Sequence, residues 1–575
     1  MKKVILYLLV FTLILSTVFA CISCSSENVD TDTDDTTAPV EEKNPITVFE
    51  NNAYNIVIVY PHDAPNLIED TAFSFSAYLL QSTGGVYPQV VSDREYKDMD
   101  TSDMSMILIG KTSISGVEST FENTYYGTAY TRISGNKYQV VINDKEESLL
   151  FLNKAKALLG NSTLSSIIFD ESWEFSVANN TALNVLPLYN DCFAEETVDC
   201  GDGAYMKVIP DTDKDGFEAY IEKSTQAGYE IYTRTEIGDN SFATLTTDGY
   251  VMNAMYLPVR NEARLIIEPE EITTLPKLES ENKYEVICSS SVTQLGLENR
   301  VEDCQYGMCY ILKLADGRFV VIDGGVNADY ILERFLKTIK ELAEDPDNIT
   351  IATWFLTHMH GDHIGLLERI LATPEVDLNI NQIIYNAPER DFFIETESEY
   401  FLTRVNTFID TINEKGFEVV KAHPGQIFHL ANMKFTIYGT AEMFSLEDTS
   451  VFNNSCLLIH VATEGQTILF PGDSGERESE NMIELYGKHL KSDILQLVHH
   501  GYSGADTSYY ELVDPQILLW PLALYDYEIG PKMVKDRDIN EYFFREEGIS
   551  LKEMYVAGST NVTLPLPYDK VTPAN

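Results

Sequence analysis

The chain has 575 residues, of which 44% are apolar and 11% aromatic, so it is globular and too long for a single hydrophobic core. Its 40 Lys and Arg residues against 90 Asp and Glu residues give a formal net charge of −50. A field of that sign repels phosphate backbones and anionic lipid, which disfavours sequence-independent nucleic-acid binding and membrane attachment through basic patches. We expect two to four domains with a solubilising acidic surface.

The first residues have the pattern of an export signal. MKK precedes the apolar stretch VILYLLVFTLILSTVFA, which runs into CISCSS. This resembles a bacterial lipoprotein signal, in which a cysteine after a small residue is lipidated; we assign Cys21, with Cys24 as the alternative. Residues 1–21 are then the signal and 22–46 an acidic, flexible tether. We expect an exported protein, lipid-anchored on the outer side of a bacterial cytoplasmic membrane; an uncleaved anchor would also place the body outside the cytoplasm.

Six further cysteines follow the signal. Export permits disulfides, and the pairs close enough in sequence to consider are Cys192 with Cys200 and Cys304 with Cys309. None of them has the paired C-x-x-C spacing of a structural zinc site. Free buried thiols are the alternative.

Residues 47–185 alternate between strand and helix patterns. NIVIVYP, SMILIG and YQVVIN read as strands, and DTAFSFSAYLLQSTGG and ESLLFLNKAKALLG as helices that end at glycine. The pattern predicts a small α/β domain. It loosely resembles the accessory domain that precedes the catalytic barrel in some glycoside hydrolases, which implies an association with carbohydrate.

Residues 186–292 predict a small α+β domain with strands AYMKVIP, GYEIYTRTEI, YVMNAMYLPV and ARLIIEP around the helix GFEAYIEKSTQAG. Its segment DTDKDGFEAYIE has the spacing of a calcium loop, with Asp211, Asp213, Asp215, Gly216 and Glu222 in the required places. A strand rather than a helix precedes it, so an acidic turn that caps the following helix explains the same residues. Both interpretations stay open.

Residues 293–575 carry the chemistry. The hairpin CYILKLADGRFVVIDGG is followed by alternating helices and strands, which indicates an α/β sandwich. At 354–365 the run WFLTHMHGDHIG places three of the ten histidines within six positions. His358 and His360 are two apart in an extended stretch and can converge on one ion, whereas Asp362 and His363 face a second direction where the chain turns into a helix. Imidazole and carboxylate ligands suit zinc, with manganese or iron as alternatives.

Two later segments, FPGDS ending at Ser474 and LVHHG ending at Gly501, again place acid and imidazole side chains at strand ends. Together with the upstream IDGG, the four motifs resemble the metallo-β-lactamase superfamily. The resemblance implies a C-terminal αββα sandwich, preceded by the two small α/β and α+β domains, with two divalent metals, foremost Zn²⁺. It implies the following roles: His358 and His360 on metal one; Asp362 and His363 on metal two; Asp473 bridging; His499, or alternatively His500, closing metal two; Asp323 ordering the loop from behind; and Asp362 and Asp473 as the catalytic acids.

One position departs from the family pattern. The third histidine of metal one is expected about twenty residues before Asp473, where this chain reads SVFNNSCLL. Pairing across the hairpin puts Asn454 near Asp473, so we expect it to be a weak ligand or to hold a water. His460 lies further along the strand and is expected to be structural, with His423 and His429 as remaining alternatives.

The variant N-N-S, GDS, HHG is similar to the branch that contains the extracellular domain of DNA-uptake channels and surface phosphorylcholine esterases. This implies a hydrolase of phosphodiesters, in a small molecule, a cell-surface glycan or teichoic acid. The alternatives are a hydrolase of lactones, thioesters or β-lactams, and a non-catalytic carbohydrate-binding lipoprotein. Aromatic residues of the later loops, Trp520, Tyr525 and Tyr527 with Tyr385, are candidates for a substrate wall, and core packing is the alternative for them.

Overall fold

The computed structural model describes most of the chain beyond the tether. Residues 45–575 form one compact unit. Within the described residues no helix combines the length and apolar character needed to cross a bilayer. The predicted lipidation sites Cys21 and Cys24 lie outside the described residues. The described ranges are 45–62, 66–99, 103–114, 125–126, 128–142, 145–160, 162–170, 172–176, 182–189, 196–298, 307–387, 399–443, 452–502, 504–523 and 551–572.

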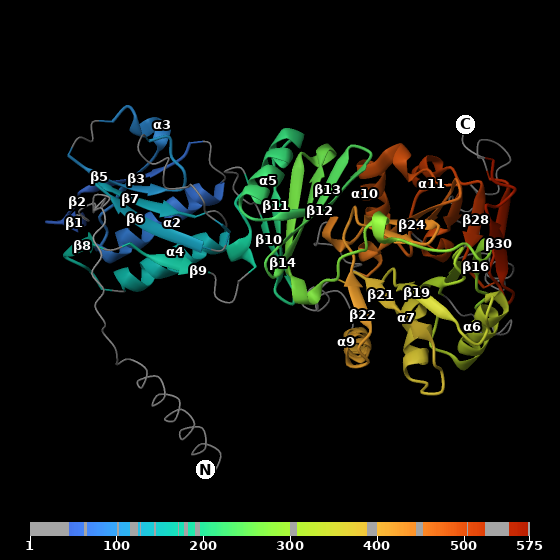
Figure 1. The fold of residues 1–575 in the computed structure, drawn as a ribbon. Coiled ribbons are helices and arrows are strands. Elements are labelled where there is room, and N and C mark those ends of the chain that lie inside the picture. The colour runs from blue at the N-terminus through green and yellow to red at the C-terminus, as the bar shows by residue number, and fades with distance from the viewer. Residues whose placement is uncertain are drawn as a thin grey trace, which may run out of the picture. The chain divides into compact units, whose positions relative to one another are not determined.

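The N-terminal region has the predicted α/β content (Figure 1). Its main sheet has the order β4-β3-β5-β7-β6-β9, and a smaller sheet has the order β2-β1-β8. The run IVIVY of β3 is buried throughout its centre because apolar clusters cover both faces of the sheet. The elements are β1 (Ile46–Glu50), β2 (Ala53–Tyr54), β3 (Ile56–Tyr60), α2 (Asn66–Ser82), β4 (Gln89–Ser92), α3 (Asp93–Tyr96), β5 (Ser105–Ile109), β6 (Thr128–Ser134), β7 (Lys137–Val141), α4 (Lys145–Leu159), β8 (Ser166–Phe169) and β9 (Glu174–Ser176).

The middle region is a six-stranded antiparallel sheet with one long helix, in the order β10-β11-β15-β14-β13-β12. The sequence pattern predicts four of its strands and the helix, but does not predict β10 and β13. Asp213 caps α5 by accepting the N–H of Gly216 at 2.8 Å, which is the helix-cap interpretation of the acidic turn. The elements are β10 (Glu196–Gly201), β11 (Ala204–Ile209), α5 (Lys214–Gln226), β12 (Glu230–Ile237), β13 (Asn240–Thr247), β14 (Tyr250–Leu257) and β15 (Glu262–Pro269).

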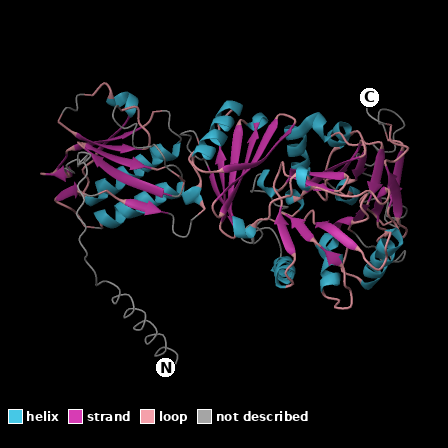
Figure 2. Ribbon diagram, in the orientation of Figure 1, coloured by secondary structure: helices cyan, strands magenta, loops and turns pink. Residues whose placement is uncertain are grey.

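The C-terminal region is the predicted αββα sandwich. One sheet has the order β22-β21-β19-β18-β17-β16-β30, with β20 beside β19, and the other has the order β23-β24-β25-β26-β27-β28-β29. A fully apolar cluster fills the space between them. Helices α6, α7 and α9 cover the outer face of the first sheet, and α10 and α11 that of the second (Figures 1 and 2).

The strands of the first sheet are β16 (Ser290–Gln294), β17 (Cys309–Lys313), β18 (Phe319–Asp323), β19 (Thr350–Phe355), β20 (Asn379–Ile380), β21 (Gln382–Tyr385), β22 (Glu418–Lys421) and β30 (Val562–Leu566). Those of the second are β23 (Ile427–Leu430), β24 (Met433–Gly439), β25 (Leu458–Thr463), β26 (Gln466–Phe470), β27 (Ile494–Gln496), β28 (Ile517–Trp520) and β29 (Glu553–Val556). The helices are α6 (Asp329–Leu342), α7 (Gly361–Leu371), α9 (Glu399–Glu414), α10 (Glu476–Tyr486) and α11 (Thr507–Val513).

The middle sheet and the C-terminal region share one core. Phe242, Met255 and Ile266 of the middle sheet belong to the same buried cluster as Leu458 and Trp520 of the second sandwich sheet. The other face of the middle sheet packs on α5, so its central strands β11, β14 and β15 are apolar on both sides. The middle sheet is therefore built against the sandwich and does not stand apart from it.

A buried ionic cluster crosses the same interface. Glu268 of β15 contacts the Lys421 Nζ at 2.9 Å and the His423 Nε2 at 2.8 Å. The Nδ1 atom of His423 lies 3.2 Å from Glu442, which also accepts a hydrogen bond from Asn386 at 2.8 Å. Burial alone would raise the pKa of Glu268, but the two cations hold it at about 2, and the two carboxylates raise the pKa of His423 to about 9 against its burial. Two buried cations are thus balanced by two buried anions.

Cysteines in the described residues are free thiols. Cys200 and Cys288 are partly buried, and Cys309 and Cys456 are buried. Cys192 and Cys304, the partners considered for Cys200 and Cys309, lie outside the described residues. Burial raises the pKa of Cys200 to about 12, which keeps this thiol protonated.

Candidate metal centre

The predicted ligands meet where strands of both sandwich sheets end. β18 and β19 run parallel in the first sheet, and β26 and β27 run parallel in the second. His358, Asp473 and His499 lie three residues beyond the ends of β19, β26 and β27, respectively. Parallel strands bring their carboxyl ends to one edge, so segments more than a hundred residues apart converge there.

Asp323 fixes the loop that carries the histidine motif. It is fully buried at the end of β18 and accepts the N–H of Thr357 at 2.7 Å and the Thr357 hydroxyl at 2.7 Å. Its Oδ2 atom also lies 2.8 Å from Nδ1 of His363. This bond occupies one ring nitrogen of His363 and turns the other, Nε2, toward the ligand group.

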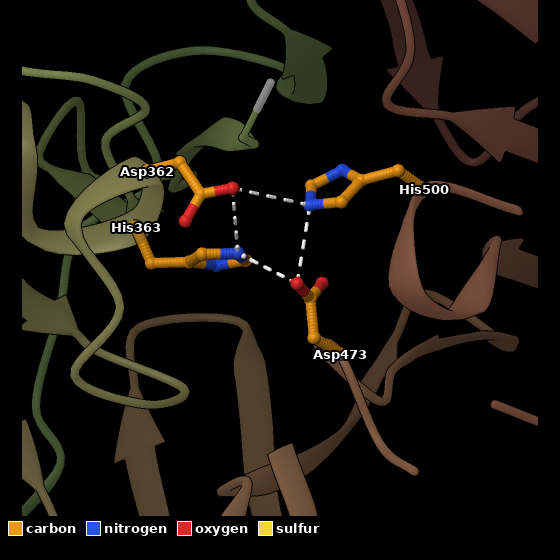
Figure 3. A group of neighbouring side chains, drawn as sticks. All are labelled: Asp362, His363, Asp473 and His500. Atoms are coloured by element: carbon orange, nitrogen blue, oxygen red, sulfur yellow. Dashed lines mark hydrogen bonds and ion pairs between the residues drawn. The ribbon is translucent and has the colours of Figure 1, made fainter. Parts of the chain in front are cut away.

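Four side chains form a compact ligand group, shown in Figure 3: Asp362, His363, Asp473 and His500. Nε2 of His363 and Nε2 of His500 each lie 3.1 Å from Oδ2 of Asp473. Oδ2 of Asp362 lies 3.6 Å from the His500 nitrogen and 3.9 Å from the His363 nitrogen. Ligand atoms held tetrahedrally at about 2.1 Å from a zinc ion are about 3.4 Å apart, so these spacings fit one divalent cation.

Unpartnered polar atoms support the same conclusion. Oδ1 of Asp473 is buried without a hydrogen-bond partner among the described residues, and Nε2 of His500 is buried with only the Asp473 carboxylate 3.1 Å away. A buried acceptor without a partner costs free energy that a bound cation would recover. Nδ1 of His500 is held by the carbonyl of Pro521 at 2.9 Å, which directs Nε2 to the ligand group.

Three further imidazoles, those of His358, His360 and His499, lie near Asp473. Nε2 of His358 and Nε2 of His499 lie 3.9 and 3.8 Å from its Oδ2 atom, and Nδ1 of His360 lies 3.0 Å from Nε2 of His358. Burial and the neighbouring imidazoles lower the pKa of His358, and burial lowers the pKa values of His360 and His499. All three are therefore neutral imidazoles, the form that binds metal.

The structure places His500, the predicted alternative to His499, in the compact group with Asp362, whereas His499 lies outside that group with its Nε2 atom 3.8 Å from Oδ2 of Asp473. The prediction assumed that the first residue after the strand faces metal two. Both residues instead have left-handed backbone conformations, with φ of 46° and 53°, so the alternation of an extended chain does not apply. Trp520 secures this turn by donating its indole N–H to the His500 carbonyl at 2.8 Å.

The segment SVFNNSCLL occupies the place in the sequence where the family pattern has the third histidine of metal one. The segment that replaces that histidine contributes Asn453, whose Nδ2 atom lies 3.5 Å from Nε2 of His499. Asn454, the predicted weak ligand or water holder, packs against Gly475, where any Cβ atom would collide with its side-chain oxygen, and this oxygen is buried without a hydrogen-bond partner among the described residues. Its role stays a prediction. Asn453 was not among the predicted site residues, and its only signal was its place beside Asn454.

The other candidate histidines lie outside both groups. His460 stacks on Tyr438 with ring centroids 4.9 Å apart, and burial lowers its pKa to about 4, in agreement with a structural role. His423 is held between Glu268 and Glu442. Trp520 is fully buried, so it forms no substrate wall; Tyr525 and Tyr527 lie outside the described residues.

The comparisons with known proteins address this same region. Residues 303–512 match the family model described as the metallo-beta-lactamase superfamily. These residues form a metallo-β-lactamase superfamily domain. The sandwich, the IDGG turn and the two ligand groups of the domain agree with the resemblance seen in the sequence.

Individual relatives are distant. The domain-bearing chain is 25% identical over 150 residues to ComE operon protein 3 of Bacillus subtilis (strain 168), a match that covers 26% of this chain and 17% of that protein. Among solved structures, the metallo-beta-lactamase fold protein YhfI of Bacillus subtilis is 12% identical, with 48% of this chain and 100% of that chain covered and a TM-score of 0.30. CmlA, a diiron beta-hydroxylase of Streptomyces venezuelae, is 11% identical over 52% of this chain and 55% of its own, with a TM-score of 0.30.

Proposed function

We propose that the metallo-β-lactamase domain is a metal-dependent hydrolase of phosphodiesters. One observation carries the proposal: Oδ2 of Asp473 belongs to the compact group with Asp362, His363 and His500, and it also lies 3.9 and 3.8 Å from Nε2 of His358 and Nε2 of His499. A carboxylate shared in this way suits a pair of cations, which when bound supply a nucleophilic water and neutralise charge on the phosphoryl oxygens.

The protein's own residues then have distinct tasks. Asp473 holds both groups together through Oδ2, and its buried Oδ1 atom has no hydrogen-bond partner among the described residues, which leaves it to orient the attacking water and take its proton. Asp362 is the more exposed carboxylate of the group and faces the cavity described below. Asp323 keeps His363 in place from behind.

The choice of a phosphodiester rests on the motif variant. The N-N-S, GDS and HHG pattern is similar to a branch of mostly phosphodiester hydrolases, and the match to ComE operon protein 3 fits that branch. The export signal adds the location: we propose that the enzyme is anchored through Cys21, or Cys24, outside the cytoplasmic membrane, where its substrate is a small molecule or a cell-surface phosphodiester.

The test measures metal content and substrate class together. The purified full chain should hold two equivalents of divalent metal, hydrolyse bis-p-nitrophenyl phosphate, and leave nitrocefin and a lactone panel intact. Asp362→Ala should lose metal and turnover, whereas Asp410→Ala, on the exposed face of α9, should lose neither. Turnover of only nitrocefin or lactones would replace the phosphodiester by a carbonyl substrate, and less than half an equivalent of metal would favour a non-catalytic binding protein.

A further inference from the structure

A large groove adjoins the metal centre between α7 and α9. Its volume is about 1030 Å³, and Gly361 and Asp362 of the metal-binding loop form part of its wall. Helix α9 contributes one face, with residues spaced three and four apart: Tyr400, Phe401, Thr403, Arg404, Thr407, Phe408 and Thr411. The groove runs from the metal ligands along this helix, and Tyr400 and Thr411, eleven residues apart, are separated by about 16 Å along the axis.

The charged groups in the wall are already paired. Glu368 accepts a hydrogen bond from Nε of Arg404 at 2.8 Å and another from Asn327 at 3.3 Å. Arg404 also reaches the carbonyl of Gly361 at 3.4 Å, and a Cβ atom at Gly361 would collide with the guanidinium. Arg404 and Glu368 therefore brace the metal-binding loop and neutralise each other, so that among the described lining residues the charged group outside this pair is Asp362, itself a predicted metal ligand.

Two of the hydroxyl groups on α9 are also occupied. Thr407 donates to the Thr403 carbonyl at 2.7 Å, and Thr411 donates to the Thr407 carbonyl at 2.6 Å, so both donate within the helix. Tyr400 and Thr403 add two further hydroxyl groups to the wall, and the apolar part of the lining comes from Phe401, Phe408, Leu371, Val326 and Ala372. A sugar, which needs hydrogen-bond partners for each hydroxyl, finds few in such a wall.

We infer that the substrate of the metal centre carries an uncharged alkyl chain next to its scissile bond, and that this chain lies in the groove between α7 and α9. The inference rests on the proposed function for the reaction at the metals. An elongated, charge-compensated and mainly apolar groove that opens at a metal ligand fits a hydrocarbon chain better than a polyanion or an oligosaccharide. The substrate class is then a phosphoric ester of an aliphatic chain.

The test uses binding, so that it does not depend on catalysis. Isothermal titration of the metal-loaded full chain with methyl-, butyl-, hexyl- and octylphosphonate should show affinity rising about two- to fourfold for each added methylene. Thr407→Trp fills the groove from an exposed position of α9 and should remove this dependence while leaving methylphosphonate affinity and metal content unchanged. Asp410→Trp, on the face of α9 that does not line the groove, should keep it.

Each result of this titration either supports or contradicts the assignment of the groove to an alkyl chain. Equal affinity for all four phosphonates, no binding of any of them, or the same loss in Thr407→Trp and Asp410→Trp would overturn the groove assignment. Tighter binding of glycerol phosphate than of butylphosphonate would show that the site selects a polar group instead. Hydrolysis of bis-p-nitrophenyl phosphate is measured separately, so a failure of the proposed function is seen as lost turnover with the chain-length dependence intact.

Discussion

Replacing Glu268 by Gln should destabilise the interface between the middle sheet and the metallo-β-lactamase domain. Glu268 is fully buried and contacts two cations, Lys421 and His423, at 2.9 and 2.8 Å. The amide keeps the shape of the carboxylate but removes its charge, so two buried cations would face only Glu442. Removal of one partner from a buried ion pair costs about 3–5 kcal/mol because an uncompensated charge is left in a medium of low polarity.

His423 gives an independent lower figure for this cost. Its pKa is about 9 in the folded protein, against about 6.5 for an unperturbed histidine, so at about pH 7 its protonation contributes about 2.5 kcal/mol to stability. Since the folded pKa is raised, this contribution is complete below about pH 6.5 and is lost as pH rises through about 9. Loss of Glu268 removes most of this contribution of His423 to stability. The charge of Lys421, which loses its contact with Glu268, adds the remaining cost.

The measurement is urea unfolding of the full chain followed by tryptophan fluorescence, with Trp520 in the shared core as a reporter. Glu268→Gln should lower the free energy of unfolding by about 3–5 kcal/mol near pH 6 and by clearly less near pH 10, where His423 has lost its proton in both proteins. Glu230→Gln, at an exposed position of β12, is the matched control and should have no effect. A change below about 1 kcal/mol near pH 6, or an equal gap at both pH values, would refute the role of the cluster.

Three further predictions concern the metal site and the anchor. His500→Ala and Asp362→Ala should each remove the same equivalent of metal, with no further loss in the double variant, whereas His499→Ala should remove the other equivalent. Elemental analysis measures the metal content of each variant. If the His500 and His499 variants lose the same equivalent, the two histidines do not bind separate metals. Asp323→Asn leaves the N–H of Thr357 and the ring of His363 without their acceptor, so metal affinity should fall about 10- to 100-fold in a competition titration with a chelator, and unchanged affinity would show that the loop needs no such support. Cys21→Ser should abolish labelling by radioactive palmitate and release the protein from the membrane fraction while Cys24→Ser does neither; the opposite pattern would assign the lipid to Cys24.

Much of the sandwich could be predicted because its strands and helices are locally consistent. The buried strand before His358, the hairpin that ends at Asp323 and the helical runs ADYILERFLKTIKELA and HIGLLERIL each show their own period, and the close spacing of the histidine motif indicates a metal site beside them. The strands of the middle sheet are harder to predict. β10 (ETVDCG) and β13 (NSFATLTT) contain few large apolar residues, so period-two patterning does not mark them; tertiary packing makes them strands.

Finer details of the site depend on backbone geometry that the amino-acid sequence does not indicate. The order of His499 and His500 follows from two left-handed residues in succession, an arrangement that non-glycine residues seldom adopt. In the same way, the helical turn Asn453–Ser455 directs Asn453, and not Asn454, toward His499, because pairing across a hairpin no longer applies in a helical turn. Glu268, a buried partner of His423, comes from β15, 155 residues earlier in the chain, and no local pattern could have indicated it.

The common core of the middle sheet and the sandwich limits how this protein can be divided. A fragment that begins at the family match would expose Leu458 and its neighbours to water and leave Lys421 and His423 without Glu268. The smallest soluble unit that retains the metal centre should therefore begin before β10, near Glu196. For the same reason we expect the middle sheet and the sandwich to occur together in one chain. A chain with the ligand motifs but without the middle sheet should aggregate.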